Sequence, residues 1–455
     1  MNANDYLTAL AGKRIAVCGI GKNNLPVIRQ LLGYGARVTA CDRRSRAELG
    51  GTADELAAAG VTLKLGDGYL AELDADLILR TPGMKPYLPE FEDARRRGIP
   101  VTSEMELFFD LCPAPIYAVT GSDGKTTTTT VIAGLLGRAG KRVFLGGNIG
   151  RPLLPLVTEI TAEDVAVVEL SSFQLTRMQK RPAVAVVTNI APNHLDWHTD
   201  MAEYVEAKHN LIAFQTAADR TVLNADNAYT AAFADGAPGH VRLFSRRGAV
   251  ADGAFLRDGV LCLTDGGSVT PVLPADEIRI PGVHNIENYL AAFAAVEGVV
   301  PPAVMADYAR TFAGVPHRCE LVRTLDGVRY YNDSIGSSPS RTIAGLRAFD
   351  RRVILIAGGY DKHIPYAPLG EIAPQTVRLA ILLGATADKI EAAIRDNDQT
   401  LPILRVKDLP EAVAAARRAA KDGDIVFFSP ASASFDMYRN FEERGEHFRA
   451  LVQAL

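Results

Sequence analysis

Residues 116–130, IYAVTGSDGKTTTTT, decide the fold of the domain around them. The stretch predicts a short apolar strand that breaks at Gly121, a loop closed by Gly124, and a helix that begins at Lys125. Glycines let successive backbone N–H groups point inward, and a helix N-terminus adds partial positive charge, so the loop suits a triphosphate. The common phosphate loop has its first glycine at the position that Val119 occupies here. The sequence therefore predicts a variant phosphate loop, against the alternative of an ordinary glycine-capped turn.

Three side chains near this loop have the chemistry that ATP and Mg²⁺ require. The ammonium group of Lys125 would reach the outer phosphates, and the hydroxyl of Thr126 would bind Mg²⁺. Glu169 ends an apolar strand, which is where a carboxylate ligand of Mg²⁺ lies on a phosphate-loop sheet. The alternative for Glu169, a solvated surface carboxylate, is disfavoured by the four apolar residues that precede it.

Other polar side chains follow the next predicted strand, and their interpretation is open. His194, Asp196 and His198 could form a transition-metal site, or one histidine could join carboxylates at a site for a harder metal. Lys208 lies on a predicted helix and, taken alone, is interpreted as a surface lysine.

Length, charge and cysteine usage bound the class of protein. With 455 residues, of which 48% are hydrophobic, the chain can form about three domains. The net charge is −4 and no basic run stands out, so nucleic acid is not an expected partner. The five cysteines include no Cys-x-x-Cys pair, which favours reduced thiols of a cytoplasmic protein over disulfides or zinc. No signal peptide or run of about 18 apolar residues occurs, so no membrane association is expected.

The N-terminal sequence predicts a Rossmann-like domain. A strand at 14–20, a helix to residue 33 and a strand at 37–42 surround the pattern Gly19-x-Gly21-x-x-Asn24. The third glycine of the dinucleotide fingerprint is missing, although Asp42 stands at the acidic position. Three interpretations stay open here: a dinucleotide site, a site for another nucleotide-linked ligand, and a structural half-domain.

Proline-containing breaks at 112–115 and 314–316 divide the chain into three predicted domains, 1–112, 113–314 and 315–455. Strands and helices alternate in all three, so the predicted fold class is α/β. The first and last domains are expected to be Rossmann-like, and the central one a phosphate-loop ATP-binding domain with a mostly parallel sheet. Residues 241–273 predict a small antiparallel patch.

Several motifs together resemble the Mur ligases of peptidoglycan synthesis, and most closely the branch that adds D-glutamate. They lie in chain order across all three predicted domains. The motifs are TGSDGKT at 120–126, GGNIG at 146–150, ELSSFQL at 169–175, NHLD at 193–196, GVHNIEN at 282–288, PHR at 316–318, NDS at 332–334, SASFD at 432–436 and NFEERG at 440–445.

This resemblance implies a role for each matched residue. The implied ATP contacts are Gly121, Ser122, Asp123, Gly124, Lys125, Thr126, Thr127, Asn285, Asn288, His317, Arg318 and Asp333. The implied contacts to a UDP-linked substrate are Ile20, Lys22, Asn23, Asp42, Arg43, Arg44, Gly83, Asn148 and His194. The implied D-glutamate contacts are Ser337, Lys362, Ser434 and Phe441. The implied metal ligands are Thr126, Glu169, His194 and Lys208 as its carbamate. The implied catalytic residues are Lys125, Glu169, His194, Lys208 and Arg318.

The resemblance also implies a reaction. It is the ATP-dependent joining of D-glutamate to UDP-N-acetylmuramoyl-L-alanine through an acyl phosphate, with Mg²⁺ as cofactor, in the cytoplasm and by a monomer. Two anionic oxygens must approach each other in the first step, and Mg²⁺, Lys125 and Arg318 would offset their repulsion. A free ammonium at Lys208 would repel the metal ion, whereas a carbamate would supply an anionic oxygen.

Two positions depart from the family pattern. Ile335 stands where many relatives have lysine, and Asp123 replaces the more usual asparagine of the loop. The alternatives to the implied reaction are another Mur-type or folylpolyglutamate-type ligase and, in a different class, a non-catalytic ATP-binding regulatory module. The intact catalytic set argues against the last of these.

Overall fold

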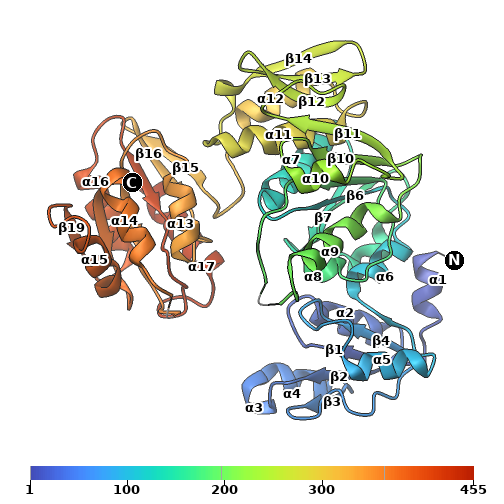
Figure 1. The fold of residues 1–455 in the computed structure, drawn as a ribbon. Coiled ribbons are helices and arrows are strands. Elements are labelled where there is room, and N and C mark those ends of the chain that lie inside the picture. The colour runs from blue at the N-terminus through green and yellow to red at the C-terminus, as the bar shows by residue number, and fades with distance from the viewer. Residues whose placement is uncertain (1, 196, 363) are drawn as a thin grey trace. The chain divides into compact units, whose positions relative to one another are not determined.

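The computed structural model describes residues 2–195, 197–362 and 364–455. Its chain divides into two compact units, each with its own sheets and cores (Figure 1). The first unit comprises Met1–Ala275 and Glu287–Tyr308, and the second comprises Asp276–Ile286 and Ala309–Leu455. The first unit holds two sheets, which we call the first and the middle domain, and the second unit holds the sheet of the last domain.

The first domain is a parallel sheet with strand order β3-β2-β1-β4-β5 (Figure 1). Its central strands β1 and β4 are apolar and buried, as expected for a parallel sheet with covered faces. The loops after β1 and β2 leave the same edge of the sheet, because Cys18 pairs in register with Cys41. The elements are α1 (Ala3–Thr8), β1 (Arg14–Cys18), α2 (Asn24–Gly33), β2 (Arg37–Asp42), α3 (Arg46–Leu49), α4 (Gly51–Ala58), β3 (Thr62–Leu65), β4 (Leu77–Arg80), α5 (Pro89–Arg96), β5 (Val101–Thr102) and α6 (Glu104–Leu111).

The middle domain is built on a nine-stranded sheet of order β14-β13-β12-β11-β10-β9-β6-β8-β7. Strands β6 to β12 run parallel, and β13 and β14 extend the sheet with antiparallel pairing. The elements are β6 (Ile116–Thr120), α7 (Lys125–Arg138), β7 (Val143–Gly147), η1 (Leu154–Glu159), β8 (Val165–Glu169), α8 (Ser172–Leu175), β9 (Val184–Val187), α9 (Met201–Ala213), β10 (Arg220–Asn224), α10 (Ala228–Ala232), β11 (His240–Ser245), β12 (Asp252–Arg257), β13 (Val260–Asp265), β14 (Val269–Pro274), η2 (Ala275–Glu277), α11 (Val283–Val296) and α12 (Pro302–Thr311).

One hydrophobic cluster packs the first two domains together. It includes Val27 and Ile28 of the first domain, Phe108 of α6, and Leu154 and Val168 of the middle domain. Shared burial of this kind removes apolar surface of both domains from water, which stabilises their association. The two domains therefore form one compact unit.

The middle sheet positions its loops for ligand binding. Strand β6 lies between β8 and β9, and all three run parallel, so their carboxyl ends reach one edge of the sheet. The connection from β6 leads to β7 on one side of it, and the connection from β8 leads to β9 on the other side, which makes this the kind of switch point where open α/β sheets bind ligands.

The last domain is a six-stranded sheet of order β15-β16-β20-β17-β18-β19, with only β15 antiparallel to its neighbour. Separate clusters of buried residues cover its two faces, one of them around Leu355 and the other around Ile354. The elements are β15 (Glu320–Leu325), β16 (Val328–Asn332), α13 (Pro339–Leu346), β17 (Val353–Ala357), α14 (Ala367–Thr376), β18 (Val377–Leu382), α15 (Ala387–Arg395), β19 (Ile403–Arg405), α16 (Leu409–Ala419), β20 (Ile425–Phe428) and α17 (Phe441–Gln453).

These sheets confirm the predicted α/β class with three domains. The predicted antiparallel patch at 241–273 is only partly right: β11 runs parallel to β10, and β12 to β14 extend the large sheet. In the part of the chain that the structure describes, no helix has both the length and the apolar character needed to cross a membrane. The exact domain boundaries stay predictions.

Candidate active site

The phosphate loop joins β6 to α7 and requires glycine at two positions. Gly121 and Gly124 have φ angles of +150° and +78°. A Cβ at Gly121 would lie 1.8 Å from the Thr188 hydroxyl oxygen, and one at Gly124 would lie 2.3 Å from Oδ1 of Asn288. Both conformation and close approach therefore exclude larger residues.

The end of β9 holds the loop in place. The Asp123 N–H donates to Oδ1 of Asn189 over 2.9 Å, and the Thr188 hydroxyl donates to the Asp123 carbonyl over 2.6 Å. The Lys125 ammonium donates to the carbonyls of Gly121 and Ser122, both at 2.9 Å. The cation is thus held against the loop whose N–H groups are suited to phosphate.

Glu169 connects the loop helix to the end of β7. Its side chain is buried, Oε2 accepts from the Thr126 hydroxyl over 2.7 Å, and Oε1 accepts from the Asn148 amide over 2.8 Å. A hydroxyl and a carboxylate at this spacing are the oxygen donors that Mg²⁺ prefers. Among the residues described, no group of three or more His, Cys, Asp and Glu side chains is placed to hold a metal ion.

Lys208 is not a surface lysine; that interpretation, made from its helix alone, is wrong. It lies on α9 with 1% of its surface exposed. Its ammonium group donates to the Gly121 carbonyl over 2.8 Å and lies 4.7 Å from the centre of the Tyr204 ring. Burial, and next the charge of Lys125, lower the Lys208 pKa well below its usual range. A neutral amine at this position is the form that adds CO₂.

The two histidines of the 193–198 segment lie in different environments. His194 is exposed, has a φ of +55°, and stacks edge-on against Phe173 with the ring centres 4.9 Å apart. His198 is buried, its Nε2 lies 2.9 Å from the Ser172 hydroxyl, and burial lowers its pKa. Only His194 is therefore placed to meet a ligand from solvent, and Asp196 lies outside the described residues.

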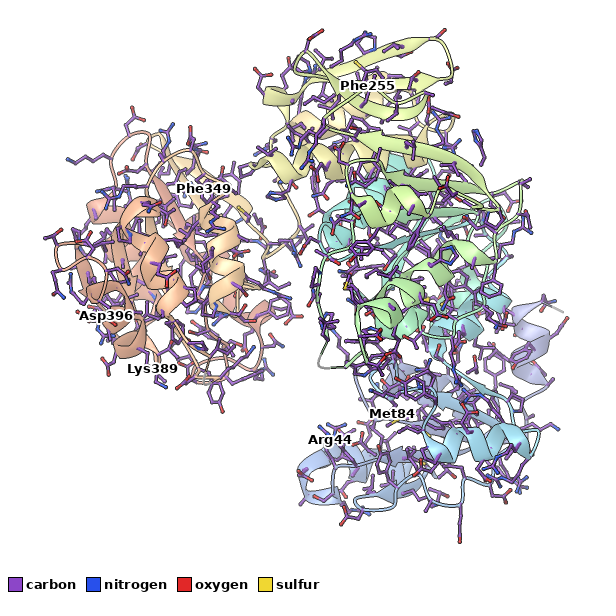
Figure 2. The ribbon with its side chains drawn as sticks, viewed as in Figure 1. Arg44, Met84, Phe255, Phe349, Lys389 and Asp396 are labelled. Carbon is purple, nitrogen blue, oxygen red and sulfur yellow. The ribbon has the colours of Figure 1, made fainter. Side chains whose placement is uncertain are left out.

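In the first domain, Asp42 organises the loop after β1. Burial opposes its ionisation, but hydrogen bonds from Arg44 and from the Ile20 N–H prevail and lower its pKa to about 2. Oδ2 accepts from the Ile20 N–H over 2.7 Å, and Oδ1 accepts from the Arg44 N–H over 3.0 Å. The Arg44 guanidinium, on the face seen in Figure 2, also donates to the Ile20 carbonyl over 2.7 Å. The carboxylate thus fixes the loop and a cation, an arrangement suited to an anionic ligand.

The other predicted contacts for the UDP-linked substrate are mostly accessible. Lys22, Arg43, Gly83 and Asn148 are exposed, and Asn23 is half-buried. These positions lie at the carboxyl edges of the first and middle sheets, where ligands of such folds bind.

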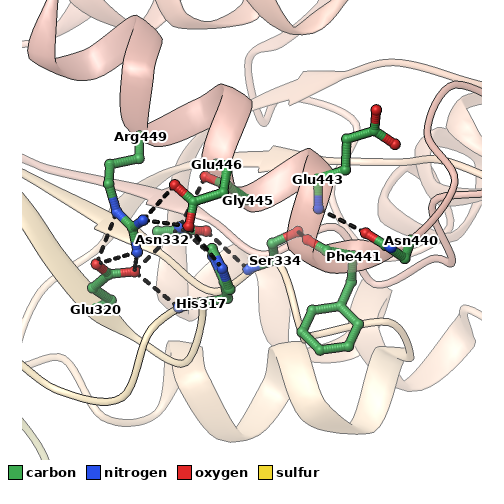
Figure 3. A network of polar contacts seen from close by, with 10 residues as sticks. All are labelled: His317, Glu320, Asn332, Ser334, Asn440, Phe441, Glu443, Gly445, Glu446 and Arg449. Carbon is green, nitrogen blue, oxygen red and sulfur yellow. Dashed lines mark hydrogen bonds and ion pairs between the residues drawn. The ribbon is translucent and has the colours of Figure 1, made fainter. Parts of the chain in front are cut away.

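In the last domain, the C-terminal helix α17 packs on the turn that carries His317 (Figure 3). His317 has a φ of +63°, and its N–H donates to Oε2 of Glu320 over 2.8 Å. Asn332 donates to the Gly445 carbonyl over 3.1 Å and lies 3.0 Å from Nδ1 of His317. A Cβ at Gly445 would lie 2.2 Å from that nitrogen, so the helix packs directly on the imidazole.

Asp333 is buried beside this turn. It accepts hydrogen bonds from the Cys319 N–H over 3.1 Å and from the Ser429 hydroxyl over 2.7 Å. Burial raises its pKa to about 6, against the opposing effect of those bonds and of the Arg318 charge. Asn285 belongs to the same unit, whereas Asn288, on the next turn of α11, lies against the phosphate loop.

The predicted D-glutamate residues lie on three loops of the last domain. Ser434 is buried, Ser337 is half-buried and Lys362 is exposed. Phe441 begins α17, so its N–H is among those that a helix leaves without an internal partner. Its carbonyl accepts from the Ser334 hydroxyl over 2.8 Å, which fixes the helix start to the loop after β16.

Sequence reasoning missed the residue that joins these loops, Arg444. Its guanidinium is buried and donates to three backbone carbonyls: that of Ser334 over 2.8 Å, that of Ala433 over 2.9 Å and that of Ser432 over 3.1 Å. Burial lowers its pKa to about 10. Its place inside the NFEERG motif was the available signal, but the sequence alone does not show that the side chain points inward.

A cavity of about 640 Å³ lies between the first and middle domains. None of the predicted site residues lines it. Three arginines, among them the buried Arg80, and three glutamates share its wall, so their charges offset one another. The candidate site is therefore the loop edge of the sheets, not this cavity.

Comparison with known proteins gives matches in all three domains. Three family models match: the Mur ligase MurD-like N-terminal domain at residues 13–103, the Mur ligase middle domain at 119–296, and the Mur ligase glutamate ligase domain at 317–432. Among solved structures, a UDP-N-acetylmuramate-alanine ligase from Thermotoga maritima has a TM-score of 0.59 at 17% identity, covering 97% of this chain and 99% of its own. That likeness supports the shared fold.

Two curated relatives are much closer in sequence. The UDP-N-acetylmuramoylalanine–D-glutamate ligase of Acetivibrio thermocellus is 50% identical, over 99% of this chain and 98% of its own. The protein of the same name from Symbiobacterium thermophilum is 52% identical, over 97% of this chain and 98% of its own. With these relatives and matching models in every domain, the chain belongs to the Mur ligase family of ATP-dependent ligases.

Proposed function

We propose that the chain joins D-glutamate to UDP-N-acetylmuramoyl-L-alanine, using ATP, in peptidoglycan precursor synthesis. The observation that carries this proposal is the 50% identity, over nearly the full length, to a ligase of that name. The ELSSFQL motif at 169–175 and the NFEERG motif at 440–445, which resemble the branch that adds D-glutamate, agree with this proposal. We also propose that it acts as a monomer in the cytoplasm.

The first chemical step transfers the γ-phosphoryl group of ATP to the alanyl carboxylate. A carboxylate oxygen forms a bond to phosphorus as the bond to the β,γ-bridging oxygen breaks, which gives an acyl phosphate and ADP. Lys125 is held at the phosphate loop and would stabilise charge on the transferring group. Arg318 would add a second cation from the last domain.

In the second step the D-glutamate amine attacks the acyl carbon. The amide bond forms, inorganic phosphate leaves, and the amine loses a proton. The acyl phosphate makes this step feasible because phosphate is a much better leaving group than the oxide ion that a free carboxylate would have to expel.

Mg²⁺ would be held by Thr126, Glu169, His194 and the carbamate of Lys208. The paired oxygens of Thr126 and Glu169, and the buried amine of Lys208 with its lowered pKa, fit such an ion. When bound, the ion would neutralise phosphate charge during transfer. Independently of the ion, the Asn148 amide orients the Glu169 carboxylate.

D-Glutamate carries two carboxylates, so its site needs a cation and several donors. Lys362 would supply the cation, and the Ser434 hydroxyl and the Phe441 N–H would supply donors, with Ser337 as a fourth contact. Arg444 does not meet the substrate in this proposal, because carbonyls of the surrounding loops occupy its guanidinium.

The test is phosphate release with UDP-N-acetylmuramoyl-L-alanine and one amino acid at a time. We expect release that depends on D-glutamate and on both other substrates. Equal release with L-alanine or diaminopimelate would leave only the wider ligase family. Release with a folate in place of the UDP-linked substrate would support a folylpolyglutamate-type ligase, and nucleotide binding without turnover would support a regulatory module.

A further inference from the structure

Trp197 of the middle domain forms a hydrogen bond to the loop of the first domain that is predicted to contact the UDP-linked substrate. It is the only tryptophan of the chain. Its indole N–H donates to the carbonyl of Gly83 over 3.2 Å, across 114 positions of sequence. Gly83 follows β4, at the carboxyl edge of the first sheet.

The indole is fixed on the side of the middle domain. The Phe173 ring centre lies 4.7 Å from it, and the His198 ring centre is also 4.7 Å away. The Trp197 backbone N–H donates to the His194 carbonyl over 3.1 Å, and Phe173 contacts the His194 ring as well. The Trp197 indole and the His194 ring are therefore held by the same neighbour, Phe173, and by one backbone hydrogen bond.

The other face of Gly83 is open. Gly83 is exposed, its φ is not positive, and no atom lies within 4 Å of where a Cβ would stand. Neither strain nor packing within the chain requires glycine there, so the free side of this peptide is available to a ligand. A peptide that contacts a ligand on one side needs a fixed partner on the other.

We propose that Trp197 is a positioning residue for the UDP-linked substrate: its indole N–H holds the Gly83 peptide in place, while its backbone N–H and the packing of its ring on Phe173 hold His194. It connects the loop that would contact the UDP-sugar with the histidine that would meet the reacting end. This inference rests on the proposed function, because it concerns the same substrate.

The chain offers a matched control. The Tyr87 hydroxyl donates to Oε1 of Glu203 over 2.9 Å, which is another hydrogen bond between the first and middle domains and does not involve Gly83. Trp197→Phe removes the N–H donor and keeps an aromatic ring, while Tyr87→Phe removes a hydroxyl donor and keeps its ring. A general weakening of the domain contact would affect both variants alike.

The experiment measures KM for each of the three substrates by phosphate release. For Trp197→Phe we expect KM for UDP-N-acetylmuramoyl-L-alanine to rise about 3- to 10-fold, the range for loss of one hydrogen bond, with KM for ATP within about twofold of the parent. Tyr87→Phe should match the parent. An unchanged KM in Trp197→Phe, or an equal rise in Tyr87→Phe, would overturn the proposal.

A second measurement uses the unaltered protein. Because Trp197 is the only indole, its fluorescence should change saturably on addition of UDP-N-acetylmuramoyl-L-alanine without ATP. A flat titration, at concentrations where the parent turns over, would also overturn the proposal. A parent that does not turn over this substrate would instead refute the proposed function, so the two failures are distinguishable.

Discussion

The chemistry of single residues in this chain depends on their burial. Lys208 is the clearest case, because a helix lysine in sequence became a buried amine next to Lys125 in the structure. Its neighbours Tyr204 and Leu211 are buried on the same helix, and this spacing is the signal that could have predicted an inward position. The contact with the Gly121 carbonyl could not be predicted, because it joins residues 87 positions apart.

The first prediction is that Lys208 carries a carbamate. Burial and the neighbouring charge of Lys125 lower the pKa of the amine, which favours the neutral form that adds CO₂. Carbon-13 NMR after incubation with labelled bicarbonate should show one carbamate signal that Lys208→Ala lacks. Full activity of Lys208→Ala in bicarbonate-free buffer would contradict the assigned role.

The second prediction concerns Lys125, whose charge is held at the phosphate loop. Lys125→Ala should lower phosphate release by at least about 10²- to 10³-fold, as for loss of an oxyanion donor. The loop backbone is held by other residues, so the circular dichroism spectrum should not change. Near-normal release would exclude this loop as the ATP site.

At the scale of elements, strands were predictable and their partners were not. The sequence predicted β2 at its observed bounds, 37–42, and predicted β1 over 14–20, of which the strand occupies 14–18. It missed β15, although Asp326-Gly327 before Val328 is a hairpin signal, and both turn residues have positive φ. The residues of β15 show little alternation of buried and exposed side chains, because most of them are only partly buried.

The third prediction tests the link between α17 and the loops of the last domain. Arg444→Met would leave the carbonyls of Ser334 and Ser432 without their Arg444 donor and would take one of two donors from the Ala433 carbonyl, which keeps the Tyr360 N–H. The last domain should therefore lose about 2–4 kcal/mol of unfolding free energy. Arg439→Met, which removes an exposed ion pair with Glu443 at the same helix end, is the control. Equal stability of the two variants in urea would show that Arg444 does not hold these loops.

The fourth prediction concerns pH. Burial raises the pKa of Asp333 to about 6, so the folded state binds the proton more tightly than the unfolded state does. The stability from protonation is fully present below the unfolded pKa and is lost as pH rises through 6. Between about pH 5 and pH 8 the parent should lose about 1–1.5 kcal/mol relative to Asp333→Asn. Parallel pH profiles of the two unfolding free energies would contradict the raised pKa.

At the scale of the whole molecule, the order of the motifs was enough to predict three α/β domains. The packing of the first two into one unit was not predicted, because the shared cluster joins distant residues such as Val27 and Leu154. The contacts within the candidate site could not be predicted from the sequence either. Glu169 forms hydrogen bonds with both Thr126 and Asn148 only because three strands end at one edge of the sheet. The residue types of the site could be predicted from the sequence. That they meet at one edge of a sheet could be seen only in the structure.

The fifth prediction separates the three substrates. Lys362 is exposed on the last domain and would pair with a D-glutamate carboxylate. Lys362→Met should weaken use of D-glutamate by about 1.5–3 kcal/mol and leave KM for ATP and for the UDP-linked substrate nearly unchanged. Lys389→Met, which removes a cation paired with Asp361 in the same region, is the control. A defect spread equally over all three substrates would place Lys362 outside the D-glutamate site.

The most direct test follows one oxygen atom. UDP-N-acetylmuramoyl-L-alanine labelled with ¹⁸O in the alanyl carboxylate is incubated with the protein, ATP, Mg²⁺ and D-glutamate, and the released phosphate is analysed by mass spectrometry. If the carboxylate attacks the γ-phosphorus and the amine then displaces phosphate, one ¹⁸O must appear in each phosphate released. Unlabelled phosphate, or labelled phosphate formed equally well with L-glutamate, would contradict the account.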